Sequence, residues 1–386
     1  MFLKPGLFIK KVTDGGILSF FSDWLNMRSW VKYKIKIKYL ILILITLILG
    51  LTLTETTKVK TITSYSQLQI QAANIMSEAI EAIRADREER GIPVNIQLDP
   101  NKTGLIGEEY TILTTTLGNL SAKRTSTNPD FAALMVKYFQ QVDLRPGDVI
   151  AIGSSGSFPA LLLATLAASE AMKLSPITIY AIGASEYGAT IPNFTFIDML
   201  NILNQKNIIN YKLSAVSMGG NHDQAEGMFF PDSRKTIENI AEQSNTHFIN
   251  TGSLVTNIRE RIRIYQETAG EKSIKLFVNI GGASANFGDT INSINFPNGL
   301  VFGGVEIPSV PERGLLFDFL AAGIPVIHLL NIRDLALKNG IPIDPIPFPK
   351  IGQSEIYYQY GIQKWIILFT ILVAIGLLIY FKKFNL

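Results

Sequence analysis

The chain has 386 residues, enough for about two domains, and its 35 Lys and Arg against 32 Asp and Glu leave a net charge of only +3. So small a charge argues against a protein held by general attraction to nucleic acid. The sequence contains no Cys and only three His, which excludes disulfides, thiolate metal sites and cysteine nucleophiles. We therefore expect no metal, no cofactor and no nucleic-acid partner.

Two uncharged apolar runs lie near the ends of the chain. Tyr39 to Thr54 reads YLILILITLILGLTLT, and Trp365 to Phe381 reads WIILFTILVAIGLLIYF. Flanking lysines that snorkel, and the threonines after the first run, bring both close to the roughly 20 residues that cross a bilayer. We predict transmembrane helices over residues 39–57 and 362–381. A cleaved signal peptide is the alternative for the first run, although no small-residue cleavage site follows it.

Basic residues set the predicted orientation. Residues 1–38 carry 8 basic and 2 acidic residues, and Lys382 and Lys383 follow the second apolar run. Because Lys and Arg concentrate on the cytoplasmic side of membrane proteins, we expect residues 1–38 and 382–386 in the cytoplasm and residues 62–350 outside it. Both Met1 and Met27 remain possible start residues, since Met27 stands just before the basic run.

Between the two apolar runs, strands alternate with helices. A helical period over Ser66 to Arg90 ends at Gly91. From about Asp148 onward, apolar runs end in Gly-rich turns and helical stretches follow; the runs are DVIAIG, ITIYAIG, YKLSAVS, IKLFVNI and IPVIHLL. Strands this apolar indicate a parallel sheet covered on both faces. We predict an α/β fold, with a mostly parallel layered sheet and helices on both faces, and a ligand site at the carboxyl ends of the strands.

The turn GSSGS, residues 153–157, is the first candidate site. A strand leads into it and a helix is expected from about residue 158, so free backbone N–H groups point at one place. The hydroxyls of Ser154, Ser155 and Ser157 add donors for a phosphate or carboxylate. The alternative is an ordinary strand–helix turn that uses Gly for its backbone and Ser for capping.

A serine of this turn is also a candidate nucleophile. Ser155 or Ser157 would need a neighbouring base. His222 and His328 both stand at or near strand ends and are the candidates for that base. Serines and a histidine with no shared role are the alternative.

Lys123 and Arg124 form a second candidate site. They precede Asn128, the expected N-cap, and Pro129, the expected first residue of the next helix. Two cations near a helix start can bind a carboxylate or a polyanion, and a solvated basic turn is the equal alternative. The polar run at residues 114–116 is unusual for a strand and is expected to face the same cleft.

Two further turns supply polar side chains at strand ends. Ser284 and Asn286 belong to GGASAN, a second anion-type turn, and Arg333 follows the strand that contains His328. An arginine there can bind a carboxylate through two parallel hydrogen bonds. A structural ion pair is the ordinary alternative for Arg333.

The same turns carry a resemblance to a known family. The blocks TTTLGNLSAKRTSTNPDFAAL, GDVIAIGSSGSFPAL, IGASEYGA, FTFIDM, VNIGGASANFG and GIPVIHLLNIRDLAL occur in one order. Together they resemble the bacterial family called poly-gamma-glutamate system protein, over roughly residues 66–350. The resemblance implies association with other membrane proteins that make, move or anchor a γ-linked glutamate polymer. It carries over no catalytic residues.

We therefore expect a protein of the bacterial cytoplasmic (inner) membrane. Its outer domain is expected to act as an accessory component of poly-γ-glutamate synthesis, export or anchoring that binds the polymer or a small anionic ligand. One alternative is a serine-dependent hydrolase or transferase that acts on the polymer or its precursor. Another is a phosphosugar-binding domain, because GDVIAIGSSGSFPALLLATLAA is similar to such domains at the level of fold.

Overall fold

The computed structural model describes residues 35–383, and the chain divides into two compact units. The larger unit is Ile62–Gln359. The smaller unit contains the described parts of residues 1–61 and 360–386. The predicted cytoplasmic segment at 1–38 lies almost wholly outside the described residues, as does most of the predicted tail at 382–386.

A seven-stranded sheet in the order β5-β4-β3-β2-β6-β8-β7 forms the centre of the larger unit. Its strands are β2 (Val149–Ser155), β3 (Ser175–Ala181), β4 (Leu213–Ser217), β5 (Phe248–Ile249), β6 (Ile274–Ile280), β7 (Gly299–Val301) and β8 (Val326–Leu329). Neighbouring strands are parallel except β7, which is antiparallel to β8. The predicted α/β class and the mostly parallel sheet are thus confirmed.

Strand order reverses at β2. The chain passes outward from β2 through β3 and β4 to β5, and it returns on the other side of β2 as β6. All of β2 is buried, as expected for a strand that is covered on both faces. A reversal of this kind opens a crevice at the carboxyl ends of the two strands where the order changes, which is where ligands bind in open α/β sheets.

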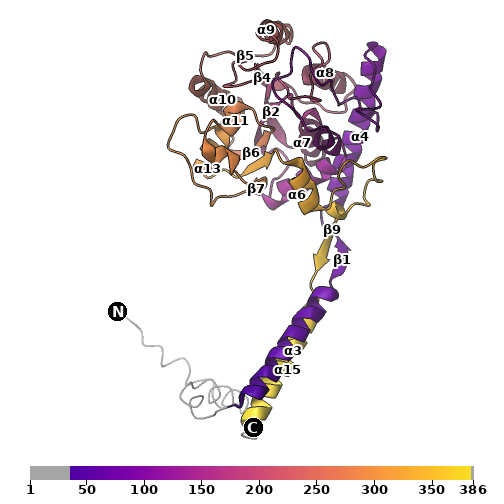
Figure 1. Ribbon diagram of the computed structural model, residues 1–386, viewed down its shortest axis with the longest axis vertical. Coiled ribbons are helices and arrows are strands. Elements are labelled where there is room, and N and C mark those ends of the chain that lie inside the picture. The colour runs from indigo at the N-terminus through magenta and orange to yellow at the C-terminus, as the bar shows by residue number, and fades with distance from the viewer. Residues whose placement is uncertain (1–34, 384–386) are drawn as a thin grey trace. The chain divides into compact units, whose positions relative to one another are not determined.

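Helices cover both faces of the sheet (Figure 1). One core contains Ile150 and Ile152 of β2, and the other contains Val149 and Ala151, so alternate residues of this strand point to opposite faces. The helices of the first core are α4 (Ser66–Glu89), α6 (Asp130–Gln141), α7 (Pro159–Met172) and α8 (Phe196–Gln205). Those of the second core are α10 (Leu254–Ala269) and α13 (Leu315–Ala321).

Shorter elements connect this framework. They are α5 (Leu120–Ser126), α9 (Ser233–Gln243), α11 (Ser284–Phe287), α12 (Ile291–Ile294), α14 (Ile332–Asn339) and the 3-10 turn Glu355–Tyr357. The expected cap at Asn128 is present in a shifted form. The Asn128 side chain accepts the Asp130 N–H at 3.1 Å, but Pro129 occupies the N-cap position rather than the first helical position.

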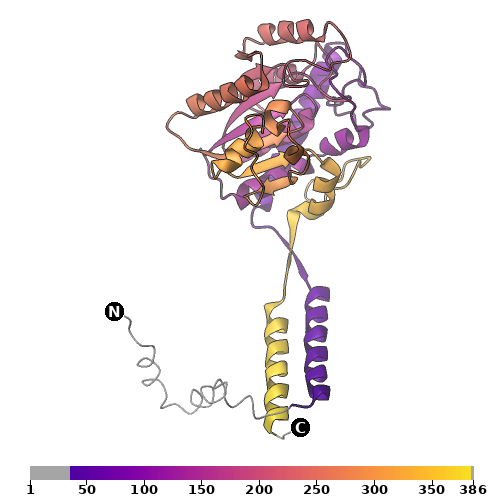
Figure 2. The ribbon, with the colours of Figure 1, turned by 60° about the vertical axis from the view of Figure 1, so that its left-hand side comes forward.

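The smaller unit contains two helices that are long and apolar enough to cross a membrane. They are α3 (Ile37–Thr56) and α15 (Lys364–Lys383). Figure 2 shows them side by side, and the rings of Tyr39 and Phe381 stack with their centroids 4.3 Å apart. Gly50 lies so close to Thr370 that a Cβ at residue 50 would collide with the threonine side chain. Small residues allow this kind of close approach between apolar helices.

Strands β1 (Val59–Ile62) and β9 (Tyr358–Gly361) form a separate two-stranded sheet. In the larger unit, the Thr63 N–H donates to the Tyr357 carbonyl at 3.1 Å. The segments that enter and leave this unit are therefore paired with each other.

A buried ion pair holds the turn after β4 in place. The side chains of Arg261 (α10) and Asp223 are completely buried, and their nearest charged atoms lie 2.6 Å apart. The other oxygen of Asp223 accepts the Ser217 hydroxyl at 2.9 Å and the Gly219 N–H at 2.6 Å. Because a buried charge without a partner is costly, separating the turn after β4 from α10 would be unfavourable, and the pair ties these two segments together.

We expect Arg261→Met to lower the free energy of unfolding by about 3–5 kcal/mol, because it leaves the Asp223 carboxylate buried without its counter-ion. The double variant Asp223→Asn/Arg261→Met should recover part of that loss. Urea denaturation of the full-length chain in detergent measures both effects.

Arg263→Met is the matched control for this prediction. Arg263 lies on the same helix, half exposed, and pairs with Glu260 and Glu267. Exposed pairs contribute about 1 kcal/mol or less. A loss in Arg261→Met no larger than that of Arg263→Met would contradict the role assigned to the buried pair.

Candidate functional site

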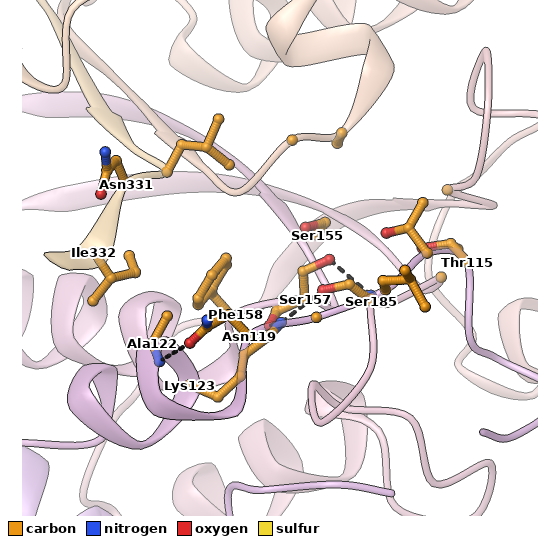
Figure 3. A pocket seen from close by; sticks show the side chains of 18 of the residues that line it. Thr115, Asn119, Ala122, Lys123, Ser155, Ser157, Phe158, Ser185, Asn331 and Ile332 are labelled. Carbon is orange, nitrogen blue, oxygen red and sulfur yellow. Dashed lines mark hydrogen bonds between the residues drawn. The ribbon is translucent and has the colours of Figure 1, made fainter. Parts of the chain in front are cut away.

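A cleft of about 540 Å³ opens at the carboxyl ends of the parallel strands. Its walls are formed by the turns that follow β2, β3, β4, β6 and β8, together with parts of residues 115–125. Thr115 and Thr116 of the polar run noted in the sequence line it, whereas Thr114 is fully buried and is not among the lining residues. Figure 3 shows side chains from these segments facing a common space.

Lys123 reaches this cleft from the short helix α5. Asn119 begins that helix, and its side-chain oxygen accepts the Ala122 N–H at 2.9 Å. The Lys123 amine donates a hydrogen bond to the Ser157 carbonyl and another to the Ser185 hydroxyl, the latter at 2.7 Å. In Figure 3 the lysine side chain runs from its helix toward these two serines.

Burial changes the acidity of the Lys123 amine. The residue is only 2% exposed, and within residues 35–383 no ion pair joins it to a carboxylate. Desolvation lowers the pKa of Lys123 to about 7, although the charge of Glu186 opposes part of this effect. The Lys123 nitrogen lies 4.1 Å from the centroid of the Phe158 ring. This cation–π contact stabilises the amine in those molecules in which it is protonated. Near neutral pH a large fraction of this amine is therefore uncharged.

The serines of the GSSGS turn have different roles. Ser154 and Ser155 are the last two residues of β2 rather than turn residues. Ser154 is fully buried, and its hydroxyl donates to the Ser155 carbonyl at 3.3 Å, so it does not line the cleft. Ser155 does line it, and its buried hydroxyl has no partner in the described chain. The Ser157 hydroxyl accepts the Ser185 N–H at 3.0 Å.

Gly188 brings Ser157 and Ser185 together. A Cβ at residue 188 would come within 2.9 Å of the Ser157 Cα and 2.5 Å of the Gly156 carbonyl oxygen. The Ala189 N–H donates to that same carbonyl at 2.7 Å. Only glycine permits so close an approach of the loop after β3 to the turn after β2.

The opposite wall contains two of the remaining predicted residues. Ser284 lines the cleft, and its hydroxyl donates to the Gly220 carbonyl at 3.3 Å. Arg333 also lines it, from the first turn of α14, where Asn331 caps the helix by accepting the Asp334 N–H at 3.2 Å. The Arg333 guanidinium makes no ion pair and no hydrogen bond within the described chain. The alternative, that Arg333 belongs to a structural ion pair, therefore has no support in these residues.

Two predicted ligand-binding residues lie elsewhere. Arg124 does not line the cleft, because its guanidinium is engaged by both carboxylate oxygens of Asp344, with Nε to Oδ1 at 2.8 Å. Arg124 is therefore neither a free cation available to a polyanion nor part of a solvated turn, because it is paired with Asp344. Asn286 is fully buried, and its side-chain oxygen lies 3.5 Å from the Arg261 guanidinium, to which it serves as an acceptor.

Neither candidate histidine contacts a serine. His222 is exposed and lies between Glu226, at 2.8 Å, and Asp289, at 3.2 Å. His328 is buried, which lowers its pKa to about 4, and its Nδ1 is 2.8 Å from the Asn279 amide nitrogen. No hydrogen bond joins any histidine to a serine within residues 35–383. The prediction that His222 or His328 serves as the base for Ser155 or Ser157 is therefore not supported by any hydrogen bond.

Ser185 is a cleft residue that the sequence did not single out, as are Asn119 and Asn221. Ser185 belongs to IGASEYGA, one of the blocks that carry the family resemblance, and it is followed by Gly188. The glycine is the available signal, since it marks a close backbone approach. No family model, no curated protein and no solved structure matches this chain. The family resemblance therefore stays a prediction.

Lys123→Met should change how stability depends on pH. The pKa of this amine is about 7 in the folded chain and has an ordinary value of 10.5. The unfolded chain consequently binds more protons between these values, and the stability of the wild type rises with pH across that window. The variant lacks this group and so lacks this rise. Between about pH 6.5 and about pH 9 the melting temperature of the variant should therefore drop by several degrees relative to that of the wild type.

Differential scanning calorimetry of the full-length chain in detergent measures this difference. Lys235→Met is the control, because it removes a lysine that is exposed on α9 rather than buried. A variation with pH that is equal in the two variants would contradict the burial effect at Lys123.

Proposed function

We propose that this chain is a membrane-anchored protein whose larger unit binds a carboxylate-bearing ligand in the cleft. It would act as an accessory component of a bacterial machinery that makes, exports or anchors a γ-linked glutamate polymer. The charge of the cleft lining supports this proposal most directly. Arg333 lines the cleft as a permanent cation, and Lys123 adds a positive charge in the fraction of molecules in which its amine is protonated. No Asp or Glu is found among the described lining residues of the cleft.

Each polar group suits a carboxylate. The planar guanidinium of Arg333 has no partner in the described chain, so it is available for two parallel hydrogen bonds to an anion. The Ser155 hydroxyl is buried without a partner, and a ligand oxygen would satisfy it. Because the chain as a whole is nearly neutral, capture of an anion would depend on these local groups rather than on a long-range field.

A γ-linked glutamate chain fits this chemistry. Each of its residues carries a free carboxylate beside a backbone amide, and a cleft of about 540 Å³ has the size of a small-molecule site. The link to this polymer rests on the six sequence blocks that resemble the family. A phosphosugar is the second candidate ligand, because the strand–GSSGS–helix connection after β2 also suits a phosphate.

The membrane anchor would be formed by α3 and α15. Both helices have the length and composition that a span requires. Lys and Arg before the first helix and at the end of the second favour cytoplasmic termini and an outer position for the larger unit.

Ligand binding is tested by calorimetry with the full-length chain in lipid nanodiscs. We expect an oligomer of γ-linked glutamate to bind the wild type, and Arg333→Gln to weaken binding by about tenfold or more, because it removes a charged hydrogen-bonding fork. Lys338→Gln is the matched control. Lys338 is an exposed cation of the same helix that pairs with Asp334, and its loss should leave affinity unchanged.

Three other ligands complete this test. An α-linked glutamate oligomer examines the linkage, and inorganic phosphate and a hexose phosphate examine the second candidate. Binding of a phosphate ligand without binding of the γ-linked oligomer would favour the phosphosugar reading. If none of the four ligands binds, the proposal is refuted.

Orientation is tested by cysteine labelling, for which the cysteine-free chain is its own background. We expect Gln243→Cys, at the exposed end of α9, to react with an impermeant maleimide in intact cells. A cysteine placed at Asn385 should react only after the cells are opened. The reverse pattern, or equal reaction of both before opening, would refute the proposed topology.

A further inference from the structure

We propose that Ser185 and Lys123 form a serine–lysine pair that carries out acyl transfer, with Ser185 as the nucleophile and Lys123 as its general base. The pair itself is inferred from the geometry of the cleft. Its substrate class, an amide bond of a γ-linked glutamate chain, rests on the proposed function. Serine nucleophiles served by a lysine base are a known variant of the serine–histidine arrangement.

Three serines of the cleft can be compared as nucleophiles. The Ser155 hydroxyl has no hydrogen-bond partner in the described chain, and so no base contacts it. The Ser157 hydroxyl is engaged by the Ser185 N–H at 3.0 Å. The Ser185 hydroxyl alone among the three contacts a titratable group, the Lys123 amine at 2.7 Å. That distance lies within the range required for direct proton transfer.

The surroundings of Lys123 suit a base rather than a structural cation. Within residues 35–383 no carboxylate pairs with it, and its other polar contact is the Ser157 carbonyl. It lies at the Phe158 ring in a nearly water-free position. An amine in such a place exchanges its proton near neutral pH, as burial lowers its pKa to about 7. A serine nucleophile needs this kind of neighbour.

The contacts also orient the pair. The Ser157 carbonyl holds the amine, and the Ser157 hydroxyl accepts the N–H of Ser185, so one residue positions both members. Lys123, Ser157 and Ser185 come from α5, from the turn after β2 and from the loop after β3. All three residues line the cleft, so a substrate carbonyl that enters it can meet the Ser185 oxygen.

The reaction balances with water as the second substrate. The uncharged Lys123 amine takes the Ser185 hydroxyl proton as the serine oxygen bonds to the amide carbon. The carbon–nitrogen bond then breaks, and the lysine ammonium gives its proton to the leaving amine. Water attacks the resulting ester with Lys123 again as base, which releases a carboxylic acid and restores the serine.

A fluorophosphonate, which reacts covalently with activated serines, tests the pair in the full-length chain in nanodiscs. We expect the adduct on Ser185, located by mass spectrometry of the digested protein. Its rate of formation should rise with pH through about 7, as Lys123 loses its proton. Ser185→Ala should carry no adduct at that position, and Ser273→Ala should react like the wild type. Ser273 is an exposed serine just before β6, at the end of that strand opposite the cleft.

Lys123→Arg separates a base from a simple positive charge. Arginine stays protonated and cannot take the serine proton, so this variant and Lys123→Met should both slow labelling by about 100-fold or more. If the lysine only supplied charge, the arginine variant would keep the wild-type rate. Should either variant fail to fold, as judged by its melting transition, the pH profile of the wild type decides, and a flat profile overturns the base role.

Binding and cleavage of the γ-linked oligomer are measured on the same preparations. Shortened oligomer in the wild type, but not in Ser185→Ala, supports the substrate class. Oligomer binding without labelling of Ser185 overturns the pair and leaves the proposed function standing. Labelling of Ser185 without oligomer binding has the opposite meaning: it supports the pair and contradicts the proposed function. An adduct on Ser155 or Ser157 overturns the assignment of the nucleophile.

Discussion

The burial of the Lys123 amine constrains the whole cleft. Moving an ammonium out of water costs several kcal/mol unless partners replace its hydration, and here the partners are a carbonyl, a hydroxyl and an aromatic ring rather than a carboxylate. The carbonyl and the ring come from the turn after β2, and the hydroxyl comes from the loop after β3. Each of these segments must be held closely, because a small displacement of any one would leave the amine with too few partners.

The sheet provides that precision. In a parallel sheet the carboxyl ends of all strands meet at one edge, so turns that are far apart in sequence become neighbours. Glycines then allow the turns to touch, as at Gly188 beside the Ser157 Cα. On the far wall, the turn after β4 is held by the buried Asp223–Arg261 pair, and α14 begins with a side-chain cap that points its first turn at the cleft. The turns that form the site are thus held by close backbone approach and by a buried ion pair.

The fold class could be predicted from the sequence because the pattern that indicates each strand and helix is local. Runs such as DVIAIG and IKLFVNI are mainly apolar, and each contributes a strand of the sheet that is wholly or mostly buried. The location of the cleft followed from a general property of such sheets rather than from any motif. The two-residue strand β5 went unpredicted because it is too short to show a period, and the helix α10 went unpredicted as well.

The roles of individual site residues needed tertiary information. Lys123 and Arg124 are adjacent, and neighbours on a helix point about 100° apart. Arg124 pairs with Asp344, which is 220 residues away in the sequence, and Lys123 lines the cleft instead. Ser154 and Ser155 were separated by the pleat of a strand that extends further than its sequence indicated. Ser185 has no motif of its own, because its significance depends on an amine that approaches from another element.

The strand order has a consequence for biosynthesis. In the finished sheet β2 is central, paired with β3 on one side and with β6 on the other. During synthesis, however, the chain through β5 is complete before Ile274 begins β6, so for that interval β2 is an edge strand. An exposed apolar edge is a template for pairing with a second chain. A nascent or truncated chain that ends before residue 274 would therefore present to its neighbours a strand that is fully buried in the finished sheet, and pairing with β6 removes that exposed edge.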